Sequence, residues 1–229
     1  MEALTEFEVL EDMMLGGLKI VQDTRLYRFT SDSVLLSKFA KAKKGDVVAD
    51  FCAGSGIVAY HFYALHPDKN LNFTLFEMQK PLLDLARKTA EYNVFEYFAF
   101  CEGKLQEIPE KYREKFSLIL CNPPYEKADT GFDNAEYHKA VCRKELTITL
   151  SEIVKASAFA LKFGGRIALL HRADRLAEVC YAFKSANIEI KRLQLGAGKA
   201  GDKPDLALFE GVKGGKPALE VMPTLVNEK

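Results

Sequence analysis

The sequence predicts an α/β fold in which helices cover both faces of a doubly wound, mostly parallel sheet of seven strands. From residue 45 to about residue 195, short apolar runs alternate with helical patterns, which is typical of consecutive β-α units. The last two apolar runs lie close together, which favours one antiparallel strand in the sheet. Turns rich in glycine or proline follow the first and fourth runs, at the edge where such sheets bind ligands.

The chain of 229 residues has the length of one α/β domain. We divide it into a prologue, a core and an irregular tail, at residues 1–44, 45–211 and 212–229. The predicted strands of the core are 47–51, 72–76, 98–101, 118–121, 166–171, 189–195 and 206–211. The helices predicted between them are 56–64, 79–92, 146–161 and 175–186.

Two local patterns organise the prologue. Segments 18–23 and 25–29 are predicted to pair as a hairpin. Ser31 or Asp32 is then predicted to cap a helix that runs to Phe39.

Composition excludes several classes of protein. Lysine plus arginine and aspartate plus glutamate both total 32, so bulk positive charge does not hold this chain on nucleic acid, although a locally basic face stays open. The five cysteines are scattered without C-x-x-C spacing, which predicts no metal and a reducing, cytoplasmic compartment. No window approaches the roughly 20 apolar residues that span a bilayer, so no membrane association is expected. We expect a monomer.

The first predicted strand runs into a glycine turn, Asp50-Phe51-Cys52-Ala53-Gly54-Ser55-Gly56. A strand, a tight glycine turn and a helix start form a site for a nucleotide-containing ligand. The turn also matches the loose dinucleotide pattern. Asp50 favours S-adenosylmethionine instead, because a carboxylate about 4 Å from a pyrophosphate charge costs on the order of 4 kcal/mol, whereas it attracts a cationic ammonium and sulfonium.

Glu77 closes the second predicted strand. An acid at this position can accept both ribose hydroxyl protons of a bound nucleoside. The alternative is an acid that stabilises the start of the helix at Gln79 through the helix dipole. The neighbouring glycine turn favours ribose binding.

Asn122-Pro123-Pro124-Tyr125 follows the fourth predicted strand. Two consecutive prolines make the turn rigid. The lone pair of an adenine amino group is delocalised into the ring, so two acceptors, Asn122 Oδ1 and the Pro123 carbonyl, are needed to localise it. Tyr125 can stack on the base once it has left its own stack. The turn therefore indicates methyl transfer to a planar amino group, with positioning as the main source of catalysis.

These motifs resemble Rossmann-like amino methyltransferases, and the chain resembles most closely the bacterial tRNA1(Val) (adenine-37-N6)-methyltransferases. Segments similar to that family's opening and closing regions are 17–23, 29–36, 164–166, 171–172 and 213–217. The resemblance implies N6-methylation of adenosine 37 in tRNA. It implies a cofactor site of Ser31, Asp50, Cys52, Ala53, Gly54, Gly56, Glu77, Met78, Leu105 and Asn122, and substrate contacts by Tyr125, Arg143, Arg172 and Arg175.

The sequence departs from that family at two places. Lys104 stands where the family has an acid that meets the cofactor adenine, so Glu102 or the Leu105 backbone is expected to substitute. Residues 143–145 read Arg-Lys-Glu in place of Arg-His-Glu.

Several cations follow strands that end at the expected ligand-binding edge, and together they would form a phosphate track beside the Asn-Pro-Pro-Tyr turn. They are Arg143, Lys144, Arg172, Arg175, Lys199 and Lys203, with Arg25 and Arg28 from the prologue.

Other acceptors and other functions stay open. The same chemistry serves ribosomal RNA or the carboxamide of a protein glutamine. A non-catalytic module that binds S-adenosylmethionine and RNA would tolerate Lys104, whereas Asn122 and Tyr125 favour an active enzyme. A nicotinamide oxidoreductase is disfavoured by Asp50.

Overall fold

The computed structural model describes residues 4–26, 28–29, 31–124 and 147–226. Its main sheet has eight strands in the order β10-β8-β9-β7-β6-β3-β4-β5. Their bounds are β3 Val47–Phe51, β4 Asn72–Glu77, β5 Phe98–Glu102, β6 Phe116–Cys121, β7 Leu161–Arg172, β8 Ile188–Ala197, β9 Leu206–Lys213 and β10 Glu220–Val226. β9 is antiparallel to both of its neighbours, and the other pairs are parallel. The predicted fold class and the single antiparallel strand are therefore confirmed.

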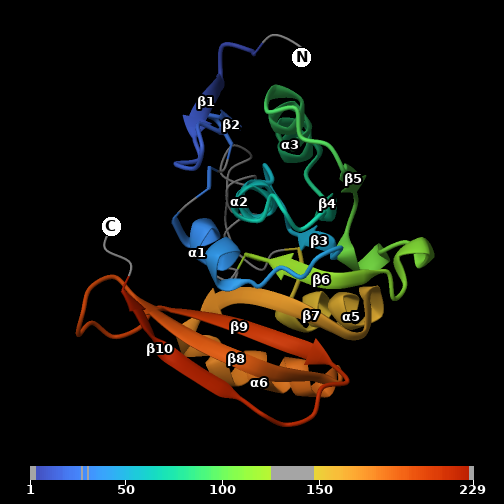
Figure 1. Ribbon diagram of the computed structural model, residues 1–229, viewed down its shortest axis with the longest axis vertical. Coiled ribbons are helices and arrows are strands. Elements are labelled where there is room, and N and C mark those ends of the chain that lie inside the picture. The colour runs from blue at the N-terminus through green and yellow to red at the C-terminus, as the bar shows by residue number, and fades with distance from the viewer. Residues whose placement is uncertain (1–3, 27, 30, 125–146, 227–229) are drawn as a thin grey trace.

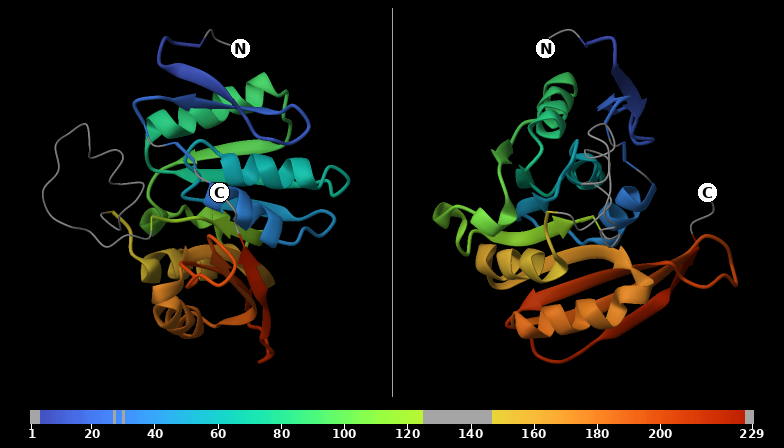
Figure 2. Two further views of the ribbon diagram at one scale, coloured as in Figure 1. Left: turned by 90° about the vertical axis from the view of Figure 1, so that its left-hand side faces the viewer. Right: turned by 180° about the vertical axis from the view of Figure 1, so that it is seen from behind.

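Helices cover both faces of the sheet (Figures 1 and 2). They are α1 Ser31–Phe39, α2 Ile57–Leu65, α3 Lys80–Tyr92, α5 Leu150–Ala160 and α6 Leu176–Ser185, with short 3-10 turns η1 Leu105–Glu107, η2 Glu110–Tyr112 and η3 Ala173–Arg175. Alternate strand residues point to opposite faces. Val48 therefore joins a buried cluster with α1, α2 and α3, whereas the adjacent Ala49 joins a second cluster with α5 and α6. No described helix is long and apolar enough to cross a membrane.

The C-terminal segment forms an eighth strand where the sequence predicts an irregular tail. β10 pairs in parallel with β8, and its register shifts between Met222 and Leu225, around Pro223. A proline inside a run argues against a central strand but is tolerated at an edge, where its missing N–H donor would face solvent. Met222 and Leu225 pack against the first core cluster, which explains why this segment is ordered on the sheet.

The prologue hairpin uses a different partner from the predicted one. β1 (Glu8–Asp12) pairs with β2 (Lys19–Asp23), so segment 25–29 is not a strand. Arg25 instead folds back onto Asp23, donating from its backbone N–H at 2.8 Å and from its guanidinium Nη2 at 2.6 Å. Both acceptors belong to one carboxylate, so the chain turns at this point and cannot continue as a hairpin strand.

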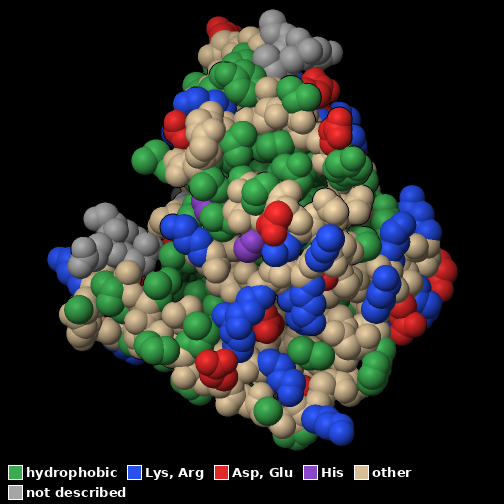
Figure 3. All heavy atoms as spheres, viewed as in Figure 1, with side chains coloured by type: hydrophobic (Ala, Val, Ile, Leu, Met, Phe, Trp, Pro, Cys, Tyr) green, Lys and Arg blue, Asp and Glu red, His purple; other side chains and the backbone are tan. Residues whose placement is uncertain are grey.

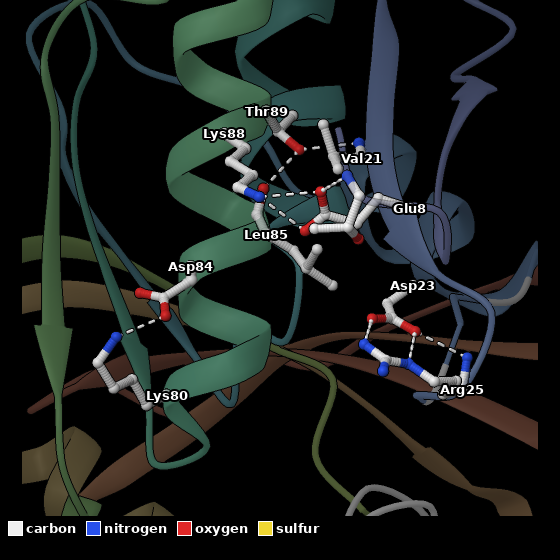
Figure 4. A network of polar contacts seen from close by, with 10 residues as sticks. Glu8, Val21, Asp23, Arg25, Lys80, Asp84, Leu85, Lys88 and Thr89 are labelled. Atoms are coloured by element: carbon white, nitrogen blue, oxygen red, sulfur yellow. Dashed lines mark hydrogen bonds and ion pairs between the residues drawn. The ribbon is translucent and has the colours of Figure 1, made fainter. Parts of the chain in front are cut away.

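A polar network fastens this hairpin to α3 (Figure 4). Lys88 Nζ donates to both carboxylate oxygens of Glu8 at 2.8 Å, and the Val21 N–H donates to Thr89 Oγ1 at 3.0 Å. Burial opposes ionisation of Glu8, but the bonds from Lys88 and Thr5 prevail and lower its pKa. The hairpin therefore stays against α3, and β2 leads the chain toward the glycine turn.

Candidate cofactor and acceptor site

A cavity of about 260 Å³ opens where β3, β4, β5 and β6 end. It is lined by residues 52–55, 76–79, 103–106, 122–124 and 147–148, and by Phe29, Ser33, Ile57, Val58 and Leu82. The two turns singled out from the sequence therefore meet in one cavity at the carboxyl edge of the sheet, as expected for a doubly wound fold.

The two glycines of the first turn have different structural roles. Gly54 and Gly56 both have positive φ angles, 56° and 88°. A Cβ on Gly54 would meet no atom within 4 Å, whereas a Cβ on Gly56 would lie 2.4 Å from Tyr60 Cε2 and 2.9 Å from Leu75 Cδ2. Gly54 lines the cavity and Gly56 does not. Gly56 is thus required for packing α2 against β4.

Glu77 lies in the cavity wall and also holds the glycine turn in place. Its Oε2 accepts the Gly54 N–H and its Oε1 accepts the Gln79 N–H, both at 2.9 Å. Burial raises the pKa of Glu77, while the bonds from Gln79, Gly54 and Met78 partly oppose this shift. The two interpretations of Glu77 are therefore compatible, because one carboxylate can stabilise the helix start and face the cavity.

Asp50 lies beneath the turn and outside the cavity lining. Its side chain is buried, and Oδ2 accepts the Ala59 N–H at 3.1 Å. Burial raises the pKa of Asp50 to about 8; the Ala59 bond opposes this shift and the charge of Glu77 adds to it. Asp50 is therefore mainly protonated near neutral pH, so its charge is a weaker argument for a cationic ligand than the sequence suggested.

Asn122 is held by one end of its amide. Nδ2 donates to Ser33 Oγ of α1 at 3.0 Å. Oδ1 is buried and has no hydrogen-bond partner among the described residues. An unsatisfied buried acceptor costs about 1–3 kcal/mol, so Oδ1 is available to accept a hydrogen bond from a ligand. Pro123 and Pro124 line the same cavity and extend the rigid turn.

The prologue residues that complete the cavity were not identified individually from the sequence. Phe29 and Ser33 line it. Buried Gln22 donates through Nε2 to Ser55 Oγ at 2.6 Å and accepts the Phe29 N–H at 3.3 Å. The only sequence signal for these contacts is the resemblance of segments 17–23 and 29–36 to an opening segment of the related enzymes.

The remaining predicted residues divide into three groups. The first group lines the cavity and consists of Cys52, Ala53, Met78, Lys104 and Leu105. Ser31 is the first residue of α1 and does not line the cavity. Arg172 and Arg175 also lie outside it; Arg172 Nε is 3.6 Å from Asp174 Oδ1, and Arg175 Nη2 is 2.6 Å from Glu178 Oε2. Tyr125, Arg143 and Lys144 fall outside the described residues.

The prologue arginines expected near the track are also paired, Arg25 with Asp23 and Arg28 with Glu11. Within the described ranges, no group of three His, Cys, Asp or Glu side chains is arranged to hold a metal ion.

The methyltransferase small domain family matches residues 30–178, more than half of the chain. This chain belongs to that family. Membership agrees with S-adenosylmethionine, the cofactor predicted from the glycine turn. A comparison of this chain with curated proteins by sequence found no match.

Solved structures of other proteins share the fold at low identity. A predicted O-methyltransferase from Agrobacterium tumefaciens aligns with a TM-score of 0.67 and 18% identity, over 85% of this chain and 86% of its own. TYW2 from Pyrococcus horikoshii, in complex with MeSAdo, has a TM-score of 0.62 and 13% identity over 92% of this chain and 73% of its own. TrmN from Thermus thermophilus has a TM-score of 0.56 and 22% identity over 79% of this chain and 48% of its own.

The raised pKa of Asp50 has a measurable consequence for the stability of the methyltransferase. With a pKa of about 8 against the ordinary value of 3.8 for an aspartate, the folded protein keeps a proton that the unfolded chain releases, so this group lowers the free energy of unfolding as pH rises from about 4 to 8. Asp50→Asn keeps an acceptor for Ala59 and removes the titration. We expect the variant to gain stability relative to wild type across this window, measured by urea unfolding at several pH values. Parallel pH profiles would contradict the buried, protonated state.

Proposed function

We propose that this methyltransferase transfers a methyl group from S-adenosylmethionine to the N6 amino group of an adenine in tRNA, at position 37 beside the anticodon of tRNA1(Val). The proposal rests on Asn122, a residue that lines the cavity and whose buried Oδ1 has no partner among the described residues. The acceptor assignment rests on the resemblance of both ends of the chain to enzymes with this activity.

The cavity residues suit a nucleoside-containing cofactor. Glu77 offers a carboxylate to ribose hydroxyls, and the backbone around Gly54 allows close approach because glycine carries no Cβ. Leu105 lines the cavity and Glu102 does not, so of these two candidates the Leu105 backbone is the one that takes over the adenine contact made by an acid in related enzymes.

The Asn-Pro-Pro turn prepares the acceptor. S-adenosylmethionine supplies an electrophilic methyl group. Asn122 Oδ1 accepts one N–H of the adenine amino group and the Pro123 carbonyl accepts the other, which localises the nitrogen lone pair toward the methyl carbon. The N–C bond would form as the methyl–sulfur bond breaks, with S-adenosylhomocysteine as the leaving group, and the nitrogen would then lose a proton to water. The turn is rigid, so this arrangement is largely preorganised.

Methyl transfer to unmodified tRNA tests the proposal directly. The protein is incubated with labelled S-adenosylmethionine and, in separate reactions, with total tRNA, ribosomal RNA or protein, and the labelled product is identified by mass spectrometry. We expect N6-methyladenosine at position 37 of tRNA1(Val), and no label in a transcript with guanosine at that position. Label in ribosomal RNA or in a protein glutamine would support methyl transfer to an amino group but contradict tRNA as the substrate. Bound cofactor with no label in any acceptor would favour a non-catalytic module.

Ser33 is expected to position Asn122 for this reaction. Ser33→Ala removes the oxygen that accepts from Nδ2, so the amide can rotate and present a donor to the substrate amino group. We expect kcat to fall by about tenfold, since small misplacements of a catalytic group are costly, with cofactor affinity unchanged. Ser33→Thr keeps the acceptor and should restore most of the turnover. A loss that only tracks thermal stability in both variants would show a purely structural role.

A further inference from the structure

Lysines gather on the face where the parallel strands begin, opposite the cavity edge. Lys43 and Lys44 precede β3, Lys115 precedes β6, Lys162 lies at the start of β7, and Lys216 follows the end of antiparallel β9. All of these side chains belong to exposed residues. Figure 3 shows this face, with its blue Lys and Arg side chains spread from the centre to the lower right. We call it the strand-start face.

Three acidic residues on the strand-start face are paired, and two other exposed ones, Glu96 before β5 and Glu220 at the start of β10, are outnumbered by lysines without an acidic partner in the described ranges. Glu114 bonds to Lys213 at 3.0 Å, Asp68 bonds to Lys69 at 2.9 Å, and Glu110 pairs with Arg113. In contrast, several exposed cations have no carboxylate partner within the described part of the chain. These are Lys41, Lys43, Lys44, Lys162 and Lys216. A chain with zero net charge therefore carries a locally positive face.

A buried polar network holds the lysine-rich loop between α1 and β3 in one conformation. Asp46 Oδ2 contacts Arg166 Nη2 at 2.6 Å and accepts the Lys43 N–H at 2.7 Å, while Arg166 Nη1 donates to the Lys41 carbonyl at 2.5 Å. Ser117 Oγ donates to Asp46 Oδ1 at 2.7 Å. The lysines thus project from a preorganised backbone, which reduces the entropy that binding would cost.

An exposed aromatic side chain lies within this basic region. Phe163, near the start of β7, is 77% exposed. Its ring rests on the backbone of Gly214, where a Cβ would come within 2.1 Å of Phe163 Cε2. The neighbouring cations are Lys162 and, one residue before Gly214, Lys213. A supported, exposed ring next to Lys162 has the composition of a platform on which an unpaired base stacks.

We propose that the strand-start face is a second RNA-binding surface, where lysines contact phosphates and Phe163 stacks on an unpaired base. This deepens the proposed function, because it assumes that the acceptor is an RNA that extends well beyond the modified base. The mixture favours RNA over a membrane, since the cations are spread along several strand starts and the exposed rings Phe163 and Tyr97 belong to opposite parts of the sheet, separated by β6, β3 and β4, instead of forming one broad apolar patch. At the catalytic edge, by comparison, Arg172 and Arg175 contact acidic side chains.

The test compares two matched double variants by their affinity for unmodified tRNA. Lys43→Gln with Lys44→Gln removes two charges from the strand-start face, and the control, Lys80→Gln with Lys155→Gln, removes two exposed lysines from α3 and α5. Fluorescence anisotropy over a salt series should show at least about fivefold weaker binding for the first variant at 0.1 M salt and a salt dependence reduced by one to two phosphate contacts. The control should bind as wild type. Equal affinities for the two variants would overturn the proposal.

Phe163→Leu tests the stacking platform separately. We expect roughly fivefold or greater loss of affinity with an unchanged salt dependence, because stacking involves no counterion release. Wild-type RNA affinity in this variant would show that Phe163 takes no part in RNA binding. Binding is measured without turnover, so loss of RNA affinity would support the surface even if no RNA is methylated. Binding of the protein to vesicles containing phosphatidylserine, with no measurable binding to RNA, would identify the ligand of this face as a membrane and overturn the proposal.

Discussion

Asn122→Ala is expected to lower methyl transfer by about two to three orders of magnitude while leaving cofactor affinity within about twofold of wild type. The substitution removes Oδ1, the acceptor for the substrate amino group, and Nδ2, the donor to Ser33. The acceptor nitrogen then keeps its delocalised lone pair, and its position is no longer defined. The expected pattern is a fall in kcat, with little change in the cofactor Kd.

Isothermal titration with S-adenosylhomocysteine and single-turnover methyl transfer separate these two effects. Asn72→Ala, at the exposed first residue of β4, is the matched control and should behave as wild type in both assays. Equal loss of cofactor binding and turnover in Asn122→Ala would show that the amide mainly builds the cofactor site. Full activity would exclude the Asn-Pro-Pro turn as the acceptor site and overturn the proposed chemistry.

Gly56→Ala is expected to destabilise the protein by at least about 3 kcal/mol, because steric overlap adds to backbone strain. The new methyl would lie 2.4 Å from Tyr60 Cε2 and 2.9 Å from Leu75 Cδ2, at a φ of 88°. Both neighbours belong to the buried core, and Tyr60 is fixed by a 2.6 Å bond from its hydroxyl to the Ala86 carbonyl. Relaxation would therefore have to move α2 away from β4.

Gly54→Ala is the matched control, because it has a similar φ angle of 56° and no atom within 4 Å of the new methyl. Only backbone strain remains, so we expect a loss of about 1–2 kcal/mol in urea unfolding. The main effect of Gly54→Ala should be weaker cofactor binding instead of lost folding stability, because Gly54 lines the cavity. Equal destabilisation by the two substitutions would show that strain alone governs this turn.

Much of the fold follows from local patterns in the sequence. The order of parallel strands and crossover helices, the inserted antiparallel strand and both ligand-binding turns were predicted, because each depends on a short period of apolar residues or on the backbone preferences of glycine and proline. The motifs located Gly54, Glu77 and Asn122, and the family resemblance added Met78 and Leu105; the structure brings all five into one cavity.

The local signals failed where a neighbour distant in sequence decides the structure. β1 replaced segment 25–29 as the partner of β2, and places Glu8 opposite Asp23 in the register. β10 joined the sheet despite Pro223, because the edge of β8 was available. Neither choice is encoded in the periodicity of the segment concerned, since pairing depends on which edges remain unpaired.

By itself, the sequence determined the doubly wound architecture and the chemical groups at the end of each strand, since backbone propensity and alternation act over a few residues. Only the tertiary structure decided what those groups do. Packing buried Asp50 and raised its pKa, joined Ser33 to Asn122 across 89 positions of sequence, and gathered lysines from separate loops onto one face. Burial and long-range contact set the charge and orientation of a side chain, and neither quantity exists until the chain has folded.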